Sequence, residues 1–121
     1  MRDYKNIKAF QLADKLVIEI YRITSVFPKC EIYGLTSQIR RAAVSVPSNI
    51  AEGSSRKHVK DYLYFLYIAR GSLTETKYLL GLSKKLEYIS SEKTKIAESL
   101  SEETAKTLYG LINYIEKDCS L

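Results

Sequence analysis

The sequence predicts an all-α protein, an antiparallel up-down-up-down four-helix bundle with a proline-kinked second helix. Apolar residues recur in steps of three and four along most of the chain, whereas the alternation typical of strands is scarce. Only 5 glycines and 2 prolines interrupt the 121 residues. Short loops between the periodic segments favour antiparallel neighbours within one domain over residues 1–121.

The first helix is expected over about residues 7–26. Its apolar stripe is wide, as in a helix that faces a bundle core. Asn6 is expected to cap its start, because an asparagine oxygen can accept a hydrogen bond from a free first-turn amide. Pro28 marks its end, since the residue before a proline avoids the helical conformation.

The second helix is expected over about residues 35–54, although Pro47 lies inside it. An internal proline removes one backbone hydrogen bond and costs about 3 kcal/mol. The apolar period nevertheless continues from Leu35 to Ile50. We therefore expect one kinked helix rather than two, with Gly53 at its end.

The third and fourth helices are expected over about residues 58–86 and 91–117. Ser90 or Ser91 is the expected cap of the fourth helix, because serine oxygens accept first-turn amide hydrogens. The residues of the fourth helix expected to face inward are Ile96, Leu100, Leu108, Leu111, Ile112 and Ile115.

The third helix carries a second stripe, roughly opposite its main apolar face. Its members are Tyr64, Ile68, Gly71, Glu75, Leu79 and Leu82. Each helix of a four-helix bundle keeps one face toward solvent, so a second apolar face predicts a partner, most simply another copy of the chain. The alternative is that these are scattered apolar residues of the surface.

Glu75 interrupts that stripe, and a buried carboxylate must be paired or strongly hydrogen-bonded. We expect it to pair with Arg40 or Arg41 of the second helix, within one chain or between copies. The candidates for this polar network and oligomer interface are Arg40, Arg41, Ser48, Asn49, Glu52, Glu75, Tyr64, Ile68, Gly71 and Leu79. The alternative is a reactive centre that draws on the same carboxylates. No spacing identifies a nucleophile, so we expect no catalytic residue and no enzyme activity.

The formal net charge is +5, and the excess lies in the first half of the chain. Residues 1–60 hold 11 basic and 5 acidic residues, whereas residues 61–121 hold 8 and 9. A cluster of basic residues falls at the turn between the second and third helices, which suits phosphate contacts; a solvated loop is the alternative. The candidate nucleic-acid-binding residues are Arg56, Lys57, Lys60, Lys5, Lys8 and Lys15.

Few residues are present for other chemistry. His58 is the only histidine, and Cys30 and Cys119 are the only cysteines, which leaves little for a metal site, a disulfide framework or histidine-assisted catalysis. No apolar run approaches the ~20 residues of a membrane span. We expect no cofactor, no metal, no small-molecule substrate and no membrane contact, in a reduced cytoplasmic protein.

Two blocks resemble one family. They run from Phe27 to Gly53 (FPKCEIYGLTSQIRRAAVSVPSNIAEG) and from Ala69 to Glu75 (ARGSLTE). Both are similar to the small bacterial four helix bundle proteins, also called ribosomal RNA intervening-sequence proteins. Some of these are encoded within insertions in large-subunit ribosomal RNA genes. The similarity extends over about residues 4–117. The family often has a tryptophan early in the first helix; this chain has none, and Phe10 lies near that place.

The resemblance implies a ring-shaped homo-oligomer, a pentamer, in agreement with the second stripe of the third helix. Nucleic-acid binding is the usual suggestion for this family, whose biochemical role is poorly defined. The accessory proteins of diversity-generating retroelements have a similar architecture and work with a reverse transcriptase. We therefore expect a non-catalytic oligomer that binds RNA or DNA. The alternative is a protein-interaction scaffold or accessory subunit, for example of a reverse-transcriptase-like system, with no direct nucleic-acid role.

Overall fold

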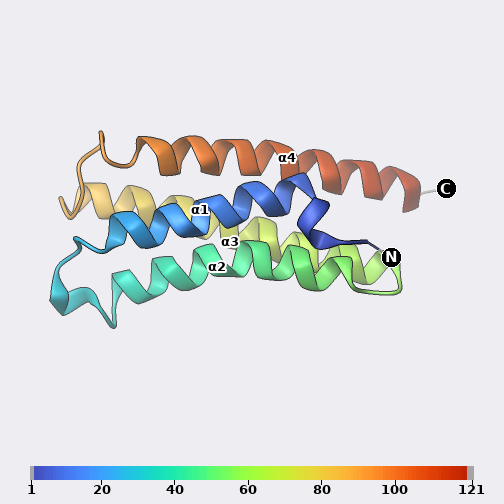
Figure 1. Cartoon of the computed structure of the whole chain (residues 1–121), viewed down its shortest axis with the longest axis horizontal. Coiled ribbons are helices and arrows are strands. Elements are labelled where there is room, and N and C mark those ends of the chain that lie inside the picture. Colours follow the sequence, from blue (N-terminus) through green and yellow to red (C-terminus); the bar gives the residue numbers. More distant parts are fainter. Residues whose placement is uncertain (1, 120–121) are drawn as a thin grey trace.

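Four α-helices arranged lengthwise make up most of the chain (Figure 1), and the computed structural model describes residues 2–119. The helices are α1 (Lys8–Thr24), α2 (Leu35–Ser54), α3 (Val59–Lys85) and α4 (Lys95–Cys119). Two short 3-10 helices, η1 (Tyr4–Asn6) and η2 (Lys29–Glu31), precede α1 and α2. No described residue is in a strand. The predicted all-α four-helix class is confirmed.

The helices pack side by side in the order α1, α2, α3, α4 and back to α1. In Figure 1, α1 and α3 run in one direction along the long axis, and α2 and α4 run in the other. The connections 25–34 and 86–94 therefore lie at one end, which we call the loop end. Residues 2–6 and 55–60 lie at the other end, which we call the turn end.

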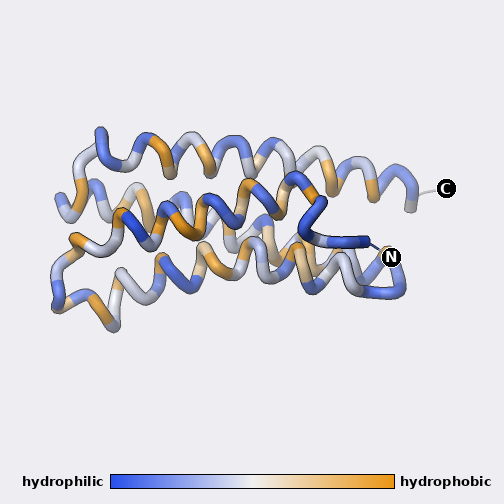
Figure 2. The backbone as a smooth tube through the Cα atoms, in the orientation of Figure 1, coloured by the Kyte–Doolittle hydropathy of each residue, from blue (hydrophilic) through white to orange (hydrophobic). Residues whose placement is uncertain are grey.

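Buried aliphatic side chains from all four helices form one core. Hydrophobic and hydrophilic stretches alternate along each helix (Figure 2), as expected for helices with one face turned inward. Burying one leucine or isoleucine side chain contributes about 1.5–3 kcal/mol, so this core holds the four helices together. Its largest fully buried aliphatic members are Leu16, Ile20, Ile39, Ile50, Leu66, Leu80, Leu108 and Ile112.

Helix α2 has the predicted bounds and continues through Pro47. One helix rather than two is thereby confirmed, while the kink stays a prediction. Gly53 lies in its last turn, where a Cβ atom would come within 2.8 Å of the Cβ of Phe65. The close approach of α2 to α3 near the turn end therefore requires a glycine at this position.

The predicted caps of the first and fourth helices are wrong, although α1 begins within one residue of its predicted start. Asn6 lies in η1, and the residue that precedes α1 is Ile7, which offers no side-chain cap. Residues 91–94 form a turn before α4, and the Ser90 hydroxyl accepts a hydrogen bond within that turn. Ile96, expected to face inward, lies in the first turn of α4 beside this loop and is 58% exposed.

Glu31 ties together the two connections of the loop end. The backbone N–H of Leu35 donates to its Oε1 at 2.9 Å, which supplies a side-chain acceptor that Gly34, the residue before α2, lacks. The hydroxyl of Tyr88 donates to its Oε2 at 2.7 Å. The ring of Tyr88 also packs against Phe27, with centres 5.8 Å apart. The two hydrogen bonds, first that from Leu35, lower the pKa of Glu31.

Candidate nucleic-acid interface

The connection between α2 and α3 carries three of the predicted cations. Arg56 and Lys57 lie in the connection and Lys60 lies in the first turn of α3; all three are exposed. The Ser55 hydroxyl donates to the carbonyl of Glu52 at 2.7 Å, which satisfies one of the last carbonyls of α2. The cations therefore project from a hydrogen-bonded turn.

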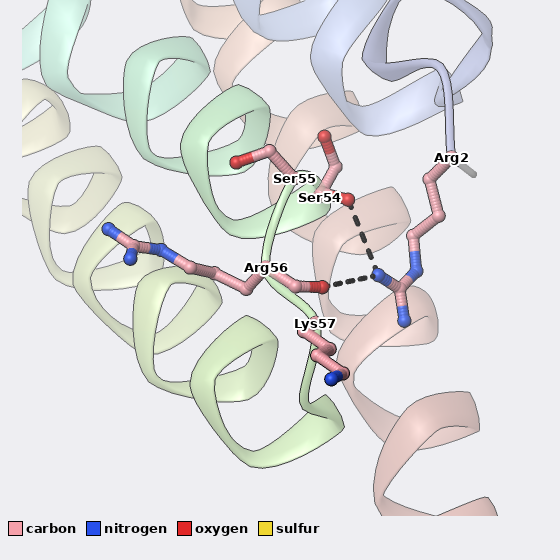
Figure 3. A pocket seen from close by; sticks show the side chains of 5 residues that line it. All are labelled: Arg2, Ser54, Ser55, Arg56 and Lys57. Atoms are coloured by element: carbon pink, nitrogen blue, oxygen red, sulfur yellow. Dashed lines mark hydrogen bonds between the residues drawn. The ribbon is translucent and has the colours of Figure 1, made fainter.

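Arg2 holds the N-terminal segment against this turn. Its Nη1 donates to the carbonyl of Ser54 at 3.3 Å and to that of Arg56 at 3.2 Å (Figure 3). Its guanidinium carbon lies 4.4 Å from the centre of the Tyr62 ring, a cation–π distance. Burial raises the pKa of Tyr62, so its ring is a neutral, desolvated surface for Arg2. Arg2 thereby adds another cation to the turn end.

An open hollow of about 560 Å³ lies between Arg2 and the turn, lined by Arg2, Ser54, Ser55, Arg56 and Lys57. Figure 3 shows the side chain of Arg56 extending away from Arg2, toward α3. Its guanidinium carbon lies 4.6 Å from the centre of the Phe65 ring, and its Nη2 lies 3.6 Å from Oε2 of Glu52. Both partners of this ion pair are exposed, so it contributes little to stability and leaves Arg56 accessible.

The remaining predicted cations lie on the N-terminal segment and on α1. Lys5 is part of η1 and Lys8 is the first residue of α1; both are exposed. Lys15 is also exposed, but it lies about 10 Å farther along α1, toward the loop end. No ion pair among residues 2–119 involves Lys5, Lys57 or Lys60. These three lysines therefore have no carboxylate partner among the described residues.

The predicted pairing of Glu75 is wrong within the protomer. Glu75 is exposed and accepts a hydrogen bond from Nε2 of Gln38 at 3.5 Å. Arg40 instead donates through Nε to Oγ1 of Thr24 at 2.9 Å. Arg41 and Glu75 line the same shallow hollow of about 220 Å³, without an ion pair between them in the described chain. A pairing between copies stays a prediction.

The other members of the predicted network lie on the outer side of the contact between α2 and α3. Asn49 donates through Nδ2 to the carbonyl of Ser45 at 2.7 Å and to its hydroxyl at 2.9 Å. The hydroxyls of Ser45 and Ser72 are hydrogen-bonded at 2.8 Å across the two helices. Ser48 and Glu52 are exposed. The Ser45–Ser72 hydrogen bond joins α2 to α3, whereas the two hydrogen bonds of Asn49 lie within α2.

The second stripe of α3 is not one continuous exposed face. Leu79 is 2% exposed and belongs to the protomer core, so it has no surface to give to an interface between copies. Ile68 is half-buried, whereas Tyr64 is 61% exposed. Gly71 is exposed, and a Cβ atom there would have no neighbour within 4 Å. Neighbours on both sides, α2 and α4, cover a wider arc of α3 than one stripe.

Within residues 2–119, no three His, Cys, Asp or Glu side chains lie close enough to hold a metal ion. No helix of this described part is long and apolar enough to cross a bilayer. His58 precedes α3, and its side chain makes no capping hydrogen bond. Cys30 is an exposed free thiol, and the side chain of Cys119 lies outside the described residues. The cations of the turn end are therefore the candidate site that we consider further.

Arg2 belongs to this site but was not among the predicted residues. Its hydrogen-bond acceptors lie 52 and 54 positions away in the sequence. No local spacing connects residues so far apart, and the only signal was an arginine in a positively charged half of the chain.

The fold and the site together define a small all-α bundle protein with exposed cations gathered at one end. The family model for the 23S rRNA-intervening sequence protein matches residues 5–110. The chain belongs to this family, which confirms the resemblance found in its two sequence blocks.

One solved structure is similar over most of its length. It is a crystal structure at 1.70 Å resolution of a protein with unknown function from the S23 ribosomal protein family of Bacteroides thetaiotaomicron VPI-5482. The TM-score is 0.76 at 25% sequence identity, over 86% of this chain and 97% of that chain. No curated protein matches the chain.

Proposed function

We propose that the protein is a non-catalytic, homo-oligomeric bundle of the cytoplasm that binds RNA or DNA through the basic side chains of its turn end. The observation that supports this proposal is the gathering of exposed cations on the turn and on the segment that Arg2 ties to it. Contacts of Lys and Arg with phosphates supply essentially all of the affinity in sequence-independent nucleic-acid binding. The family name, which refers to an intervening sequence of 23S rRNA, is compatible with an RNA partner.

A salt series tests the proposed binding. The anisotropy of a fluorescently labelled RNA should give an affinity whose logarithm falls linearly with the logarithm of salt concentration, between about 50 and 200 mM. The reason is that each phosphate neutralised by a cation releases condensed counterions. An affinity that does not change with salt contradicts the proposal.

Charge reversal locates the binding on the molecule. The triple variant Arg56→Glu, Lys57→Glu and Lys60→Glu should lose binding and flatten the salt dependence. The matched control reverses three exposed lysines near the loop end, which are Lys85, Lys93 and Lys95. It changes the net charge by the same amount and should bind far more tightly than the turn variant. Equal losses in both variants would assign the binding to net charge rather than to the turn end.

The proposed assembly is a ring, and the family resemblance implies a pentamer. Exposed aliphatic side chains support association, since soluble monomers rarely expose large apolar patches. They include Ile18 on α1 and Val26, Ile32 and Leu86 at the loop end. Sedimentation velocity and light scattering measure the copy number, and a monomer at every accessible concentration contradicts this part of the proposal.

A protein-interaction scaffold is the second candidate function. The same apolar side chains of the loop end favour it, because they offer a surface to a different protein. A single protein partner should then be recovered after nuclease treatment and lost with Ile32→Asp. If the partner protein is no longer recovered after nuclease treatment, nucleic acid bridges the two proteins, and the result supports nucleic-acid binding instead.

The absence of catalysis is also part of the proposal. Labelled RNA incubated with magnesium and a large excess of protein should stay intact. Cleavage that co-purifies with the protein and is lost in a variant of the turn end would make it a nuclease.

A further inference from the structure

The outer face of α3 continues from the turn end and carries aromatic rings that the bundle leaves uncovered. Tyr64 is 61% exposed and lies one turn beyond Lys60, on the same face of the helix. Its ring meets that of Phe65 edge to face, with centres 5.5 Å apart and an interplanar angle of 81°. Phe65 in turn lies under the guanidinium of Arg56 at 4.6 Å. Arg56, Phe65 and Tyr64 therefore form a continuous series of side-chain contacts that leads from the turn onto α3.

A second cation–aromatic pair lies farther along the same helix. The guanidinium carbon of Arg70 is 5.1 Å from the centre of the Tyr67 ring, and the Tyr67 hydroxyl donates to Glu116 of α4. Residues 56–70 contain 4 basic side chains and a single acidic one, Asp61. Basic side chains thus outnumber acidic ones in this segment, while Glu52 pairs with Arg56 and Glu116 accepts from Tyr67.

This face lacks the aliphatic surface that a contact between copies would bury. Leu79 lies in the core and Ile68 and Leu82 are half-buried, so the exposed members of the predicted stripe are Tyr64, Gly71 and Glu75. The centres of protein interfaces are depleted of lysine and glutamate, and this face exposes Lys60 and Glu75. Surfaces that bind single strands instead combine cations with rings on which bases stack. Charge complementarity therefore favours a polyanion with unpaired bases as the occupant.

We propose, on the basis of the proposed nucleic-acid function, that this face of α3 selects single-stranded over double-stranded nucleic acid. An unpaired base stacks on the exposed ring of Tyr64, and Lys57 and Lys60 neutralise the neighbouring phosphates. The bases of a duplex are already stacked on each other and offer no free π face to a side chain. Every base has a π face, so the contact reads strandedness rather than sequence.

The test uses the full chain and two probes of one sequence, a single-stranded RNA that contains 2-aminopurine and its duplex. The single-strand affinity of Tyr64→Ala should be about tenfold or more weaker than that of wild type, because the stacked base loses its partner. Tyr64→Phe keeps the ring and should bind as wild type does. The matched control is Tyr33→Ala, which removes a tyrosine that is 93% exposed at the loop end. Duplex affinity should be the same for all four proteins.

The outcomes separate this inference from the proposed function. If wild type binds both probes with salt-dependent affinity and Tyr64→Ala binds the single strand equally well, the inference is overturned and the proposed function stands. If wild type binds neither probe at low salt, the proposed function fails and the inference fails with it. A Tyr64→Ala variant that sediments as a smaller species than Tyr33→Ala assigns Tyr64 to a contact between copies, which also overturns the inference.

A measurement on wild type alone keeps the inference testable if Tyr64→Ala does not fold. Stacking on a tyrosine ring should quench the emission of 2-aminopurine in the saturated complex. Unquenched emission at every position of the probe base overturns the inference.

Discussion

The two ends of the bundle are held together in different ways. At the loop end, side chains hold each other: Glu31 accepts from Tyr88, whose ring packs on Phe27. At the turn end, Arg2 donates to two backbone carbonyls, and Figure 3 shows Arg56 and Lys57 extending from the turn in different directions. The α2–α3 turn is hydrophilic, whereas the loop end mixes apolar and polar stretches (Figure 2). Because Arg2 is held by backbone carbonyls, the exposed side chains of Lys57 and Lys60 stay accessible to a ligand.

Gly53→Ala should disrupt the packing of α2 against α3 at the turn end. Among the variants considered, it should lose the most stability. The added methyl group would lie 2.8 Å from the Cβ of Phe65 and 3.1 Å from Cδ1 of Tyr62. A Cβ atom moves only with its backbone, so α3 must shift, and overpacking of this kind costs about 1–3 kcal/mol. Chemical denaturation followed by circular dichroism measures the loss. Gly110→Ala is the control, because its Cβ would have no neighbour within 4 Å. If Gly53→Ala and Gly110→Ala were equally stable, the result would contradict the close approach of α2 to α3.

Glu31→Ala should remove the contacts that join the two connections of the loop end. It removes the acceptor for the Leu35 amide at the start of α2 and the acceptor for the Tyr88 hydroxyl. We expect Tm to fall by about 4 °C, the change produced by losing a typical helix cap of about 1 kcal/mol in a domain of this size. Glu31→Gln retains an acceptor oxygen, so its Tm should fall less. If both variants melt like wild type, Glu31 does not tie the two connections.

The stability of the loop end should depend on pH. The pKa of Glu31 is lowered by the N–H of Leu35 and then by the hydroxyl of Tyr88, which favour the charged form in the folded state. Its contribution is therefore complete above the ordinary glutamate pKa and is lost as the pH falls through the lower folded value. In melting curves across this acidic range, Glu31→Gln should show a smaller fall of Tm than wild type. Glu103→Gln, an exposed glutamate of α4, should follow wild type.

In contrast to the variants at the two ends, Gly71→Ala should stabilise the protomer. Gly71 lies inside α3 and has room for a methyl group. Replacing glycine by alanine within a helix contributes about 0.5–1 kcal/mol. A loss of stability that grows as the protein is diluted would instead place Gly71 in a contact between copies.

Arg2→Ala should have the smallest effect on stability, about 0.5 kcal/mol, because its hydrogen bonds are partly or wholly exposed. Amide hydrogen exchange should detect the change as faster exchange at the turn, with no change at the loop end. Unaltered exchange around residues 54–57 would mean that Arg2 does not order the turn.

The bounds of α2 could be predicted because local signals surround it. Gly34 and the polar residues from Ser54 onward interrupt the apolar period on either side. The start of α4 could not, because Ser90, Ser91 and Thr94 are all plausible caps in sequence. The Thr94 hydroxyl donates to the carbonyl of Ser91 at 2.8 Å, which makes residues 91–94 a turn and places Thr94 directly before the helix.

The candidate site shows the same division between local and distant signals. Arg56, Lys57 and Lys60 stand close together in the sequence, so their cluster could be predicted from the order of residues alone. The exposure of Tyr64 and the burial of Leu79 could not, because both belong to one periodic stripe. Which part of that stripe is covered depends on how α2 and α4 lie against α3, and a single helical period does not contain this information.

An even number of helices brings residue 119 back to the end of the molecule where residue 2 lies (Figure 1). A fluorophore attached near residue 2 or residue 118 would therefore report directly on the turn end. The exposed thiol of Cys30 lies at the opposite end. The 27 residues of α3 separate the two ends by about 40 Å. In a Cys119→Ser background, energy transfer from a donor on Cys30 to an acceptor on the RNA would report their separation along the bundle. Weak energy transfer from Cys30 and strong transfer from the labels near residues 2 and 118 would show that the RNA occupies the turn end.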